Sequence, residues 1–256
     1  MNDQAAQQRN LRIVKLVGQA LSEDRLVPVF RPLLEVRAPD RINFMFGCEL
    51  EIEGDQVVRY ATLERLGRHA GINGELDRWM IHHGLEALKE LHGRQPEARL
   101  VIPQSQDSLQ NPEYPKWLER QKSLRSASTQ GLVIAFRLSQ ITHDLVQAHR
   151  CFAALHELEI ETMIEGFSDH PTALKILRAM NAGYVAASRS LQLADDGVVE
   201  HRLKEFRRLG TRLLLPEIHA PTDVNPAWSC GAQLLGGDYI HPVRHDTDFS
   251  FPVTIV

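Results

Sequence analysis

The chain has 256 residues, of which 43% are hydrophobic and 24% are charged, and its formal net charge is −4 at pH 7. This composition is typical of a globular protein with a sizeable core. The negative net charge gives no sign of a basic surface that would bind nucleic acid or anionic membranes. The longest apolar runs are strand-sized and the N-terminus, Met1-Asn-Asp-Gln, is polar, so we expect neither a transmembrane helix nor a signal peptide. Cys48, Cys151 and Cys230 are far apart and odd in number, which indicates reduced thiols in a cytoplasm.

The N-terminal part predicts one helix and one irregular strand. Residues 3–21 have the spacing of an amphipathic helix. Its apolar stripe is formed by four residues: Leu11, Val14, Val17 and Leu21. Residues 26–36 predict a strand, and Pro28 and Pro32 restrict it to an irregular or edge position, because proline cannot donate a ladder hydrogen bond.

The stretch at residues 43–53 alternates apolar and acidic side chains, which predicts a strand. One face carries apolar residues: Phe44, Phe46, Cys48, Leu50 and Ile52. The other face carries Glu49, Glu51 and Glu53. Since carboxylates are almost never buried without a partner, this second face is either wet or lines a site.

The rest of the chain alternates helices with short β-branched or Leu-rich strands. A helical block at 61–91, broken near 71–74, is followed by strands predicted at 99–102, 131–136, 161–164, 183–187, 211–215 and 238–240. Helices are predicted between them, at 112–122, 142–157, 170–180 and 198–209, with one more after Pro221. This alternation predicts a parallel sheet, and about eight strands without a Gly-rich phosphate loop favour a (β/α)8 barrel over an open sheet. In such barrels the chemistry lies at the C-terminal ends of the strands.

Common catalytic motifs are missing from the sequence. There is no Gly-x-Ser-x-Gly elbow, P-loop, His-Glu-x-x-His or Cys-x-x-Cys. His82 and Glu86 are four residues apart on a helix, but one such pair is most simply a solvated helix face. Generic motifs alone therefore give a barrel without an evident active site.

Several short segments follow one another in an informative order. The most specific is the helix pair Leu63-Glu-Arg-Leu-Gly-Arg-His-Ala-Gly-Ile72 and Glu75-Leu-Asp-Arg-Trp-Met80. The others are Phe30-Arg-Pro-Leu33, Gly47-Cys-Glu-Leu-Glu51, Asn111-Pro-Glu-Tyr114, Ile164-Glu-Gly-Phe167, Ser188-Arg-Ser-Leu191 and Leu235-Gly-Gly-Asp-Tyr239. Together, over residues 26–242, they resemble the EAL domain family, the cyclic-di-GMP phosphodiesterases and their inactive relatives. The resemblance implies an α/β fold: a modified, TIM-like (β/α)8 barrel of the EAL type with an extra N-terminal helix.

The resemblance also implies where a metal site would lie. Active members hold divalent metal with oxygen ligands at successive strand ends and use it to activate a water. The signature Glu matches Glu49, and the first Asp of the family's Asp-Asp pair matches Glu165, one methylene longer. The remaining ligand positions carry other residues: Pro103, Ala135, Gly166, Ala186, Ser188 and Pro216. Because two carboxylates cannot hold a catalytic pair of ions, we expect no metal, no cofactor and no catalytic residue.

Three further positions are possible remnants of a nucleotide pocket. Arg31 stands where the family's opening strand has Gln, and Gly236 stands where its closing Gln-Gly has Gln. Glu53 stands where degenerate relatives have an Arg that contacts phosphate. A carboxylate in place of that cation repels phosphate. We therefore predict that Arg31 pairs with Glu53, Glu49 or Glu51 and fills the old pocket. A retained cyclic-di-GMP site is the disfavoured alternative.

The function implied by the resemblance is regulatory. The sequence is similar to degenerate EAL domains of the receptor or scaffold type, such as the FimX-type domains at the C-terminus of twitching-motility regulators. We expect a catalytically inactive bacterial module that binds a protein partner or a second copy of itself and is not an enzyme. A cyclic-di-GMP receptor without hydrolysis is the alternative, followed by a slow phosphodiesterase.

Three segments are expected along the chain. Residues 1–24 form the N-terminal helix, residues 25–245 the EAL-like barrel and residues 246–256 a C-terminal tail. The apolar stripe of the helix must pack on the barrel's base, on a second copy or on an upstream domain. Packing on its own barrel is the simplest of these alternatives.

Overall fold

The structure is a computed structural model that describes residues 2–52, 56–125, 128–192, 194, 196–223 and 231–251. Three features of the sequence analysis therefore lie outside the described residues: Glu53, Cys230 and most of the helix predicted after Pro221. No helix in the described ranges is long and apolar enough to cross a membrane.

The strands form one sheet that closes on itself. They are β1 (Val27–Pro32), β2 (Leu34–Glu35), β3 (Asn43–Ile52), β4 (Gln56–Arg59), β5 (Arg99–Pro103), β6 (Leu132–Arg137), β7 (Glu161–Phe167), β8 (Tyr184–Ala187), β9 (Arg212–Leu215) and β10 (Leu234–Leu235). Their order is β1-β3-β5-β6-β7-β8-β9-β10-β2, with β4 paired to β3. Because β1 and β2 are separated only by Leu33, the two ends of this order are one piece of chain, and the sheet is a barrel. The predicted barrel is confirmed.

The direction of the opening strand departs from a regular (β/α)8 barrel. From β3 through β5 to β10 the neighbouring strands are parallel. In contrast, β1 runs antiparallel to β3, and β2 runs antiparallel to β10. The strand predicted at 26–36 is thus broken at Leu33 and changes partner there, which fits the irregular position that its prolines require.

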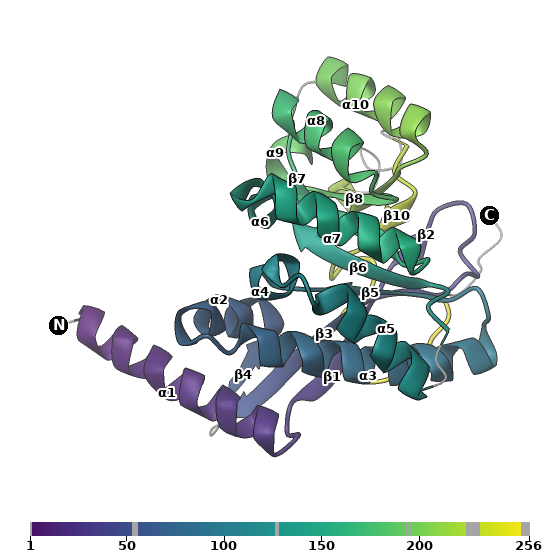
Figure 1. The fold of residues 1–256 in the computed structure, drawn as a ribbon. Coiled ribbons are helices and arrows are strands. Elements are labelled where there is room, and N and C mark those ends of the chain that lie inside the picture. Colours follow the sequence, from purple (N-terminus) through teal and green to yellow (C-terminus); the bar gives the residue numbers. More distant parts are fainter. Residues whose placement is uncertain are drawn as a thin grey trace.

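The helices cover the outside of the barrel (Figure 1). They are α1 (Asn2–Ser22), α2 (Tyr60–Ala70), α3 (Asn73–Arg94), α4 (Gln106–Gln110), α5 (Tyr114–Arg125), α6 (Leu138–His143), α7 (Leu145–Glu157), α8 (Pro171–Met180), α9 (Arg189–Gln192) and α10 (Asp196–Leu209). The short elements β4, α4 and α9 are absent from the sequence prediction, because segments of four or five residues carry almost no periodic signal.

Two apolar layers follow from the alternation of side chains along the strands. The outer layer lies between sheet and helices, and it includes Phe44, Phe46, Cys48 and Leu50, each at most 2% exposed. The inner layer fills the barrel, with Met45 packed against it: Leu33, Val101, Val133, Ala135, Met163, Tyr184, Ala186, Leu214 and Leu234. The predicted apolar face of the 43–53 strand is therefore confirmed as a face buried under helices.

The N-terminal helix packs on its own chain. Ile13, Val17 and Ala20 belong to the outer apolar layer, and α1 contacts α2 and α3. Leu11 is 65% exposed, so the predicted stripe is wrong at its first position. The buried stripe is displaced around the helix toward α2 and α3, which lie beside α1 (Figure 1).

The last strand lies earlier than predicted. Leu234–Leu235 form β10, whereas residues 238–240 form a turn in which the Ile240 N–H donates to the Gly237 carbonyl at 3.1 Å. Gly237 has a φ of 130°, and a Cβ atom there would lie 2.3 Å from the Ile218 carbonyl oxygen. The chain must turn at this point because β10 fills only the gap between β9 and β2.

The neighbouring glycines give a matched stability test. Gly237→Ala places a methyl group against the Ile218 backbone in a left-handed conformation, so it is expected to lower the free energy of unfolding by about 3 kcal/mol or more. For Gly236→Ala the close atom is Leu33 Cδ2 at 2.8 Å, the end of a side chain that can rotate, so about 1 kcal/mol is expected. Urea unfolding of both variants measures the difference. Equal losses would contradict the assignment of the turn to Gly237.

Candidate functional site

The candidate site is the mouth of the barrel, where the C-terminal ends of the parallel strands meet. The structure brings four of the predicted site residues to this region: Arg31 on β1, Glu49 on β3, Glu165 on β7 and Gly236 directly after β10. The fifth, Glu53, lies outside the described residues. The contacts of each residue decide what the mouth can bind.

Glu49 is held by the neighbouring strand. It lies directly opposite Arg59 in the antiparallel β3–β4 pair, and Arg59 Nε donates to Glu49 Oε1 at 3.2 Å. The Glu49 side chain is 10% exposed, whereas that of Arg59 is 70% exposed. The signature carboxylate is therefore nearly buried, and its counter-charge comes from the chain itself.

Arg31 does not pair with Glu49. Its Nη1 donates to Asp238 Oδ1 at 2.7 Å, across 207 residues of sequence. This hydrogen bond is the main reason that the pKa of Asp238 is lowered, with the charges of Arg31, His219 and Arg59 acting in the same direction. Among the described residues the partner of Arg31 is Asp238 and not Glu49 or Glu51, while the third predicted partner, Glu53, lies outside them. Asp238 was missed because it lies in the turn after β10, where the sequence predicts a strand.

Gly236 contributes only backbone to the mouth. Its N–H donates to the Leu215 carbonyl at 2.8 Å, and its carbonyl accepts from the Ile218 N–H at 2.9 Å. These two bonds join the end of β10 to the segment after β9. Gly236 thus closes the rim and offers no side chain to a ligand.

Glu165 faces a cation that the sequence analysis missed. It pairs in register with Arg137 on β6. Arg137 Nη1 donates to Glu64 Oε2 at 2.7 Å, and Arg68 Nη2 donates to Glu64 Oε1 at 2.9 Å. Burial raises the pKa of Glu165, while the charge of Arg137 opposes that rise. Burial alone would also raise the pKa of Glu64, but Arg137 and Arg68 together lower it.

The other predicted ligand positions are filled by apolar or already bonded groups. Ala135 and Ala186 belong to the inner apolar layer. Gln104, one place from Pro103, is 2% exposed, and its side chain accepts from the Tyr114 hydroxyl at 3.0 Å. Glu217, the carboxylate next to the ligand position at Pro216, is exposed beyond the end of β9.

This donor set does not fit a divalent metal centre. A hard cation needs several oxygen ligands, and the two matching carboxylates, Glu49 and Glu165, already face Arg59 and Arg137. No group of three or more His, Cys, Asp or Glu side chains among the described residues is arranged to hold a metal ion.

A second buried carboxylate near the mouth was also missed. Asp77 on α3 is 1% exposed and accepts from the Ser105 hydroxyl and the Ser108 hydroxyl, both at 2.6 Å, and from the Ser105 N–H. Burial raises the pKa of Asp77 to about 7, although these hydrogen bonds act against the rise. Through these hydrogen bonds Asp77 joins α3 to the start of α4, which follows the end of β5 at Pro103.

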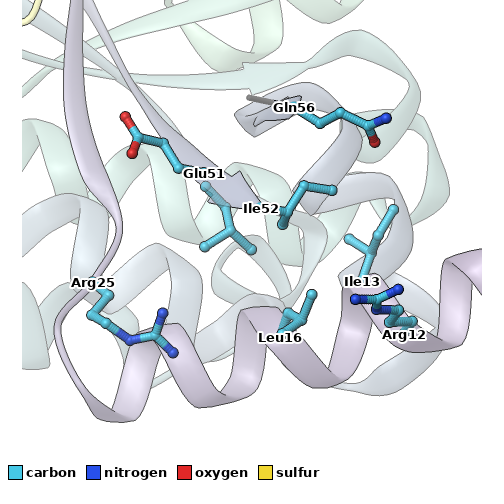
Figure 2. Close-up of a pocket in the computed structure, with 8 residues that line it drawn as sticks. Arg12, Ile13, Leu16, Arg25, Glu51, Ile52 and Gln56 are labelled. Atoms are coloured by element: carbon cyan, nitrogen blue, oxygen red, sulfur yellow. The ribbon is translucent and has the colours of Figure 1, made fainter. Parts of the chain in front are cut away.

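A separate pocket of about 580 Å³ lies between α1 and the β3–β4 hairpin. Figure 2 shows Leu16 and Ile52 between the guanidinium groups of Arg25 and Arg12, with Ile13 beside Arg12. Glu51, from the acidic face of the 43–53 strand, lines this pocket, whereas Arg31, Glu49, Glu165 and Gly236 do not. It is a feature of the α1 contact and not of the barrel mouth.

The fold and the positions at the mouth define a known class of domain. A family model described as "EAL domain" matches residues 16–242, so the chain belongs to the EAL domain family. The predicted family is confirmed. A curated protein of Thiocystis violacea, the "Uncharacterized 76.5 kDa protein in phbC 3'region", is 19% identical over 241 residues, or 93% of this chain and 35% of that protein. The chain therefore spans about a third of that relative's length.

Solved EAL domains share the architecture. A crystal structure of the FimX EAL domain has a TM-score of 0.84 at 20% identity, covering 93% of this chain and 98% of that chain. The FimX EAL domain from Pseudomonas aeruginosa bound to c-di-GMP has a TM-score of 0.82 at 21% identity, covering 94% and 99% of the two chains. The Xanthomonas citri FimX EAL domain in complex with c-diGMP reaches 0.85 at 16% identity, covering 97% and 100%. At these identities the likeness shows the fold alone.

The buried Asp77 generates a pH-dependence prediction. Its pKa in the folded chain, about 7, is above the usual 3.8 of an aspartate, so the folded state holds the proton more tightly. Its contribution to stability is therefore greatest at low pH and is lost as the pH rises. Relative to Asp77→Asn, which cannot titrate, the wild type is expected to lose about 2 kcal/mol of unfolding free energy between pH 5 and pH 7. Urea unfolding across this range measures the difference, and a pH-independent difference would contradict the prediction.

Proposed function

We propose that this EAL domain does not hydrolyse cyclic-di-GMP and acts as a regulatory protein-binding module in bacterial signalling. The observation that carries this proposal is the charge pairing at the mouth. Glu49 is paired with Arg59, and Glu165 faces Arg137, which is bonded to Glu64. Metal-assisted hydrolysis needs these oxygens free to bind ions, and here each is next to a guanidinium group.

The remaining ligand positions support the same conclusion. Ala135 and Ala186 present methyl groups inside the barrel, and neither can coordinate a metal or orient a water. Restoring a two-metal centre would need substitutions on several strands at once. Loss of the chemistry is therefore a property of the whole mouth and not of one position.

A domain that keeps its core but not its catalytic groups acts through its surface, an inference by analogy with other folds. In this proposal, residues 25–245 form the binding module, with residues 1–24 and 246–256 as its flanking segments. The partner is a protein, and a second copy of the chain is the alternative. The proposed location is the cytoplasm, which the unpaired, buried thiols of Cys48 and Cys151 support.

Inactivity is tested with purified protein, cyclic-di-GMP and Mg²⁺ or Mn²⁺, with the linear dinucleotide followed by chromatography. We expect no product above the buffer background, because the mouth lacks the oxygen ligands that generate the nucleophile. An active EAL phosphodiesterase serves as the positive control. Product formation that Glu49→Ala abolishes would identify a slow phosphodiesterase and overturn the proposal.

A second candidate function is a cyclic-di-GMP receptor without hydrolysis. It is favoured by the two FimX EAL domains solved with the dinucleotide, whose fold this chain shares. Arg31 and Arg59 supply cationic groups near the mouth, but Asp238 and Glu49 neutralise them. The protein-binding proposal therefore expects only weak binding of the dinucleotide.

Titration calorimetry with cyclic-di-GMP, with and without Mg²⁺, separates the two candidates. We expect a dissociation constant above about 100 μM, because the guanidinium groups are already paired. Asp238→Asn, which releases Arg31, is expected to tighten binding, whereas the exposed-surface variant Asp246→Asn leaves it unchanged. Micromolar or tighter binding by the wild type without metal would establish the receptor instead.

A further inference from the structure

The mouth of the barrel contains a buried carboxylate, Glu64, that two arginines contact. The Glu64 side chain on α2 is 2% exposed, and Arg137 reaches it from β6 across 73 residues of sequence. The Arg137 side chain is 34% exposed, so its guanidinium lies between the buried Glu64 and the open mouth. Arg68 also contacts Glu64, but it is 48% exposed and comes from the same helix, four residues away.

Arg137 serves a second carboxylate at the same time. Glu165 lies directly opposite it in the parallel β6–β7 pair, and the charges of Glu64 and Glu165 both help to raise the pKa of Arg137. One guanidinium therefore stands between two acidic side chains from different elements. An uncompensated carboxylate buried at this depth is strongly unfavourable, so the arrangement requires a cation.

We infer that Arg137 takes the electrostatic place of a divalent cation, and that Glu64 and Glu165 become a weak divalent-cation site when its charge is removed. Two carboxylates with waters are sufficient for loose Mg²⁺ or Mn²⁺ binding, although not for a catalytic pair of ions. The inference builds on the proposed loss of the metal centre. The test below measures the stability of the fold and not hydrolysis. The inference can therefore fail while the hydrolysis assay still finds no activity.

The test is thermal unfolding of the full chain with and without about 10 mM MnCl₂. Wild type is expected to show no Mn²⁺-dependent shift. Arg137→Gln is expected to unfold at a lower temperature, because it removes the cation opposite Glu165 and leaves Glu64 with Arg68 alone, and Mn²⁺ is expected to raise its midpoint by about 3 °C or more. Arg137→Lys, which keeps the charge, is expected to remain folded and insensitive to Mn²⁺.

Arg212→Gln is the matched control. Arg212 pairs with the buried Glu35, whose carboxylate also contacts Arg41, just as Glu64 also contacts Arg68. The loss of Arg212 removes one arginine–glutamate pair but, unlike the loss of Arg137, does not also remove the cation opposite a second carboxylate such as Glu165. This variant is expected to lose stability without any response to Mn²⁺. A response in Arg137→Gln that disappears when Glu165→Gln is added would place the ion at the mouth.

Three results would overturn the inference. The first is a Mn²⁺-dependent shift in the wild type that Glu165→Gln removes, since Arg137 would then not exclude the ion. The second is Arg137→Gln that folds without responding to Mn²⁺, and the third is Arg137→Gln that stays unfolded with and without Mn²⁺. A variant that is unfolded alone and folds with Mn²⁺ supports the inference.

Discussion

The barrel closes because one short segment changes its hydrogen-bonding partner at a single residue. β1 pairs with β3, β2 pairs with β10, and Leu33 between them points into the inner apolar layer. Every later strand then occupies a fixed place between these two ends. The position of each side chain at the mouth follows from this closure, since β1 carries Arg31 to the turn that holds Asp238.

Acidic side chains at both ends of the barrel are matched to arginines within the chain. At the base, the buried Glu35 contacts Arg212 and Arg41. At the mouth, Glu49 contacts Arg59, and Glu64 contacts Arg137. Between these ends the interior of the barrel is apolar. A charged side chain at either end therefore cannot move inward without losing its polar partners. The pairing at both ends supplies a counter-charge to each of these carboxylates.

The sequence predicted the features that depend on local pattern. Alternation in the 43–53 strand predicts its buried face, and the order of strands and helices predicts the barrel. The antiparallel direction of β1 could not be predicted, because alternation is the same in both directions along a strand. The charge partners were missed for a related reason: Arg31 and Asp238 are 207 residues apart, and Arg137 and Glu64 are 73 apart. As single residues in a sequence, Glu64 and Arg137 look like ordinary solvated side chains.

The replacements at the mouth are coupled to one another. A buried carboxylate without a metal ion needs another cation, a proton or contact with water. Glu165 faces Arg137, and Glu49 has Arg59, whereas Ala135 and Ala186 carry no charge that needs compensation. Each retained acid therefore has an arginine, and each position without one is apolar. A mouth balanced in this way has no electrostatic need for a further ion, and this balance is why the proposed function assigns binding to the outer surface of the domain.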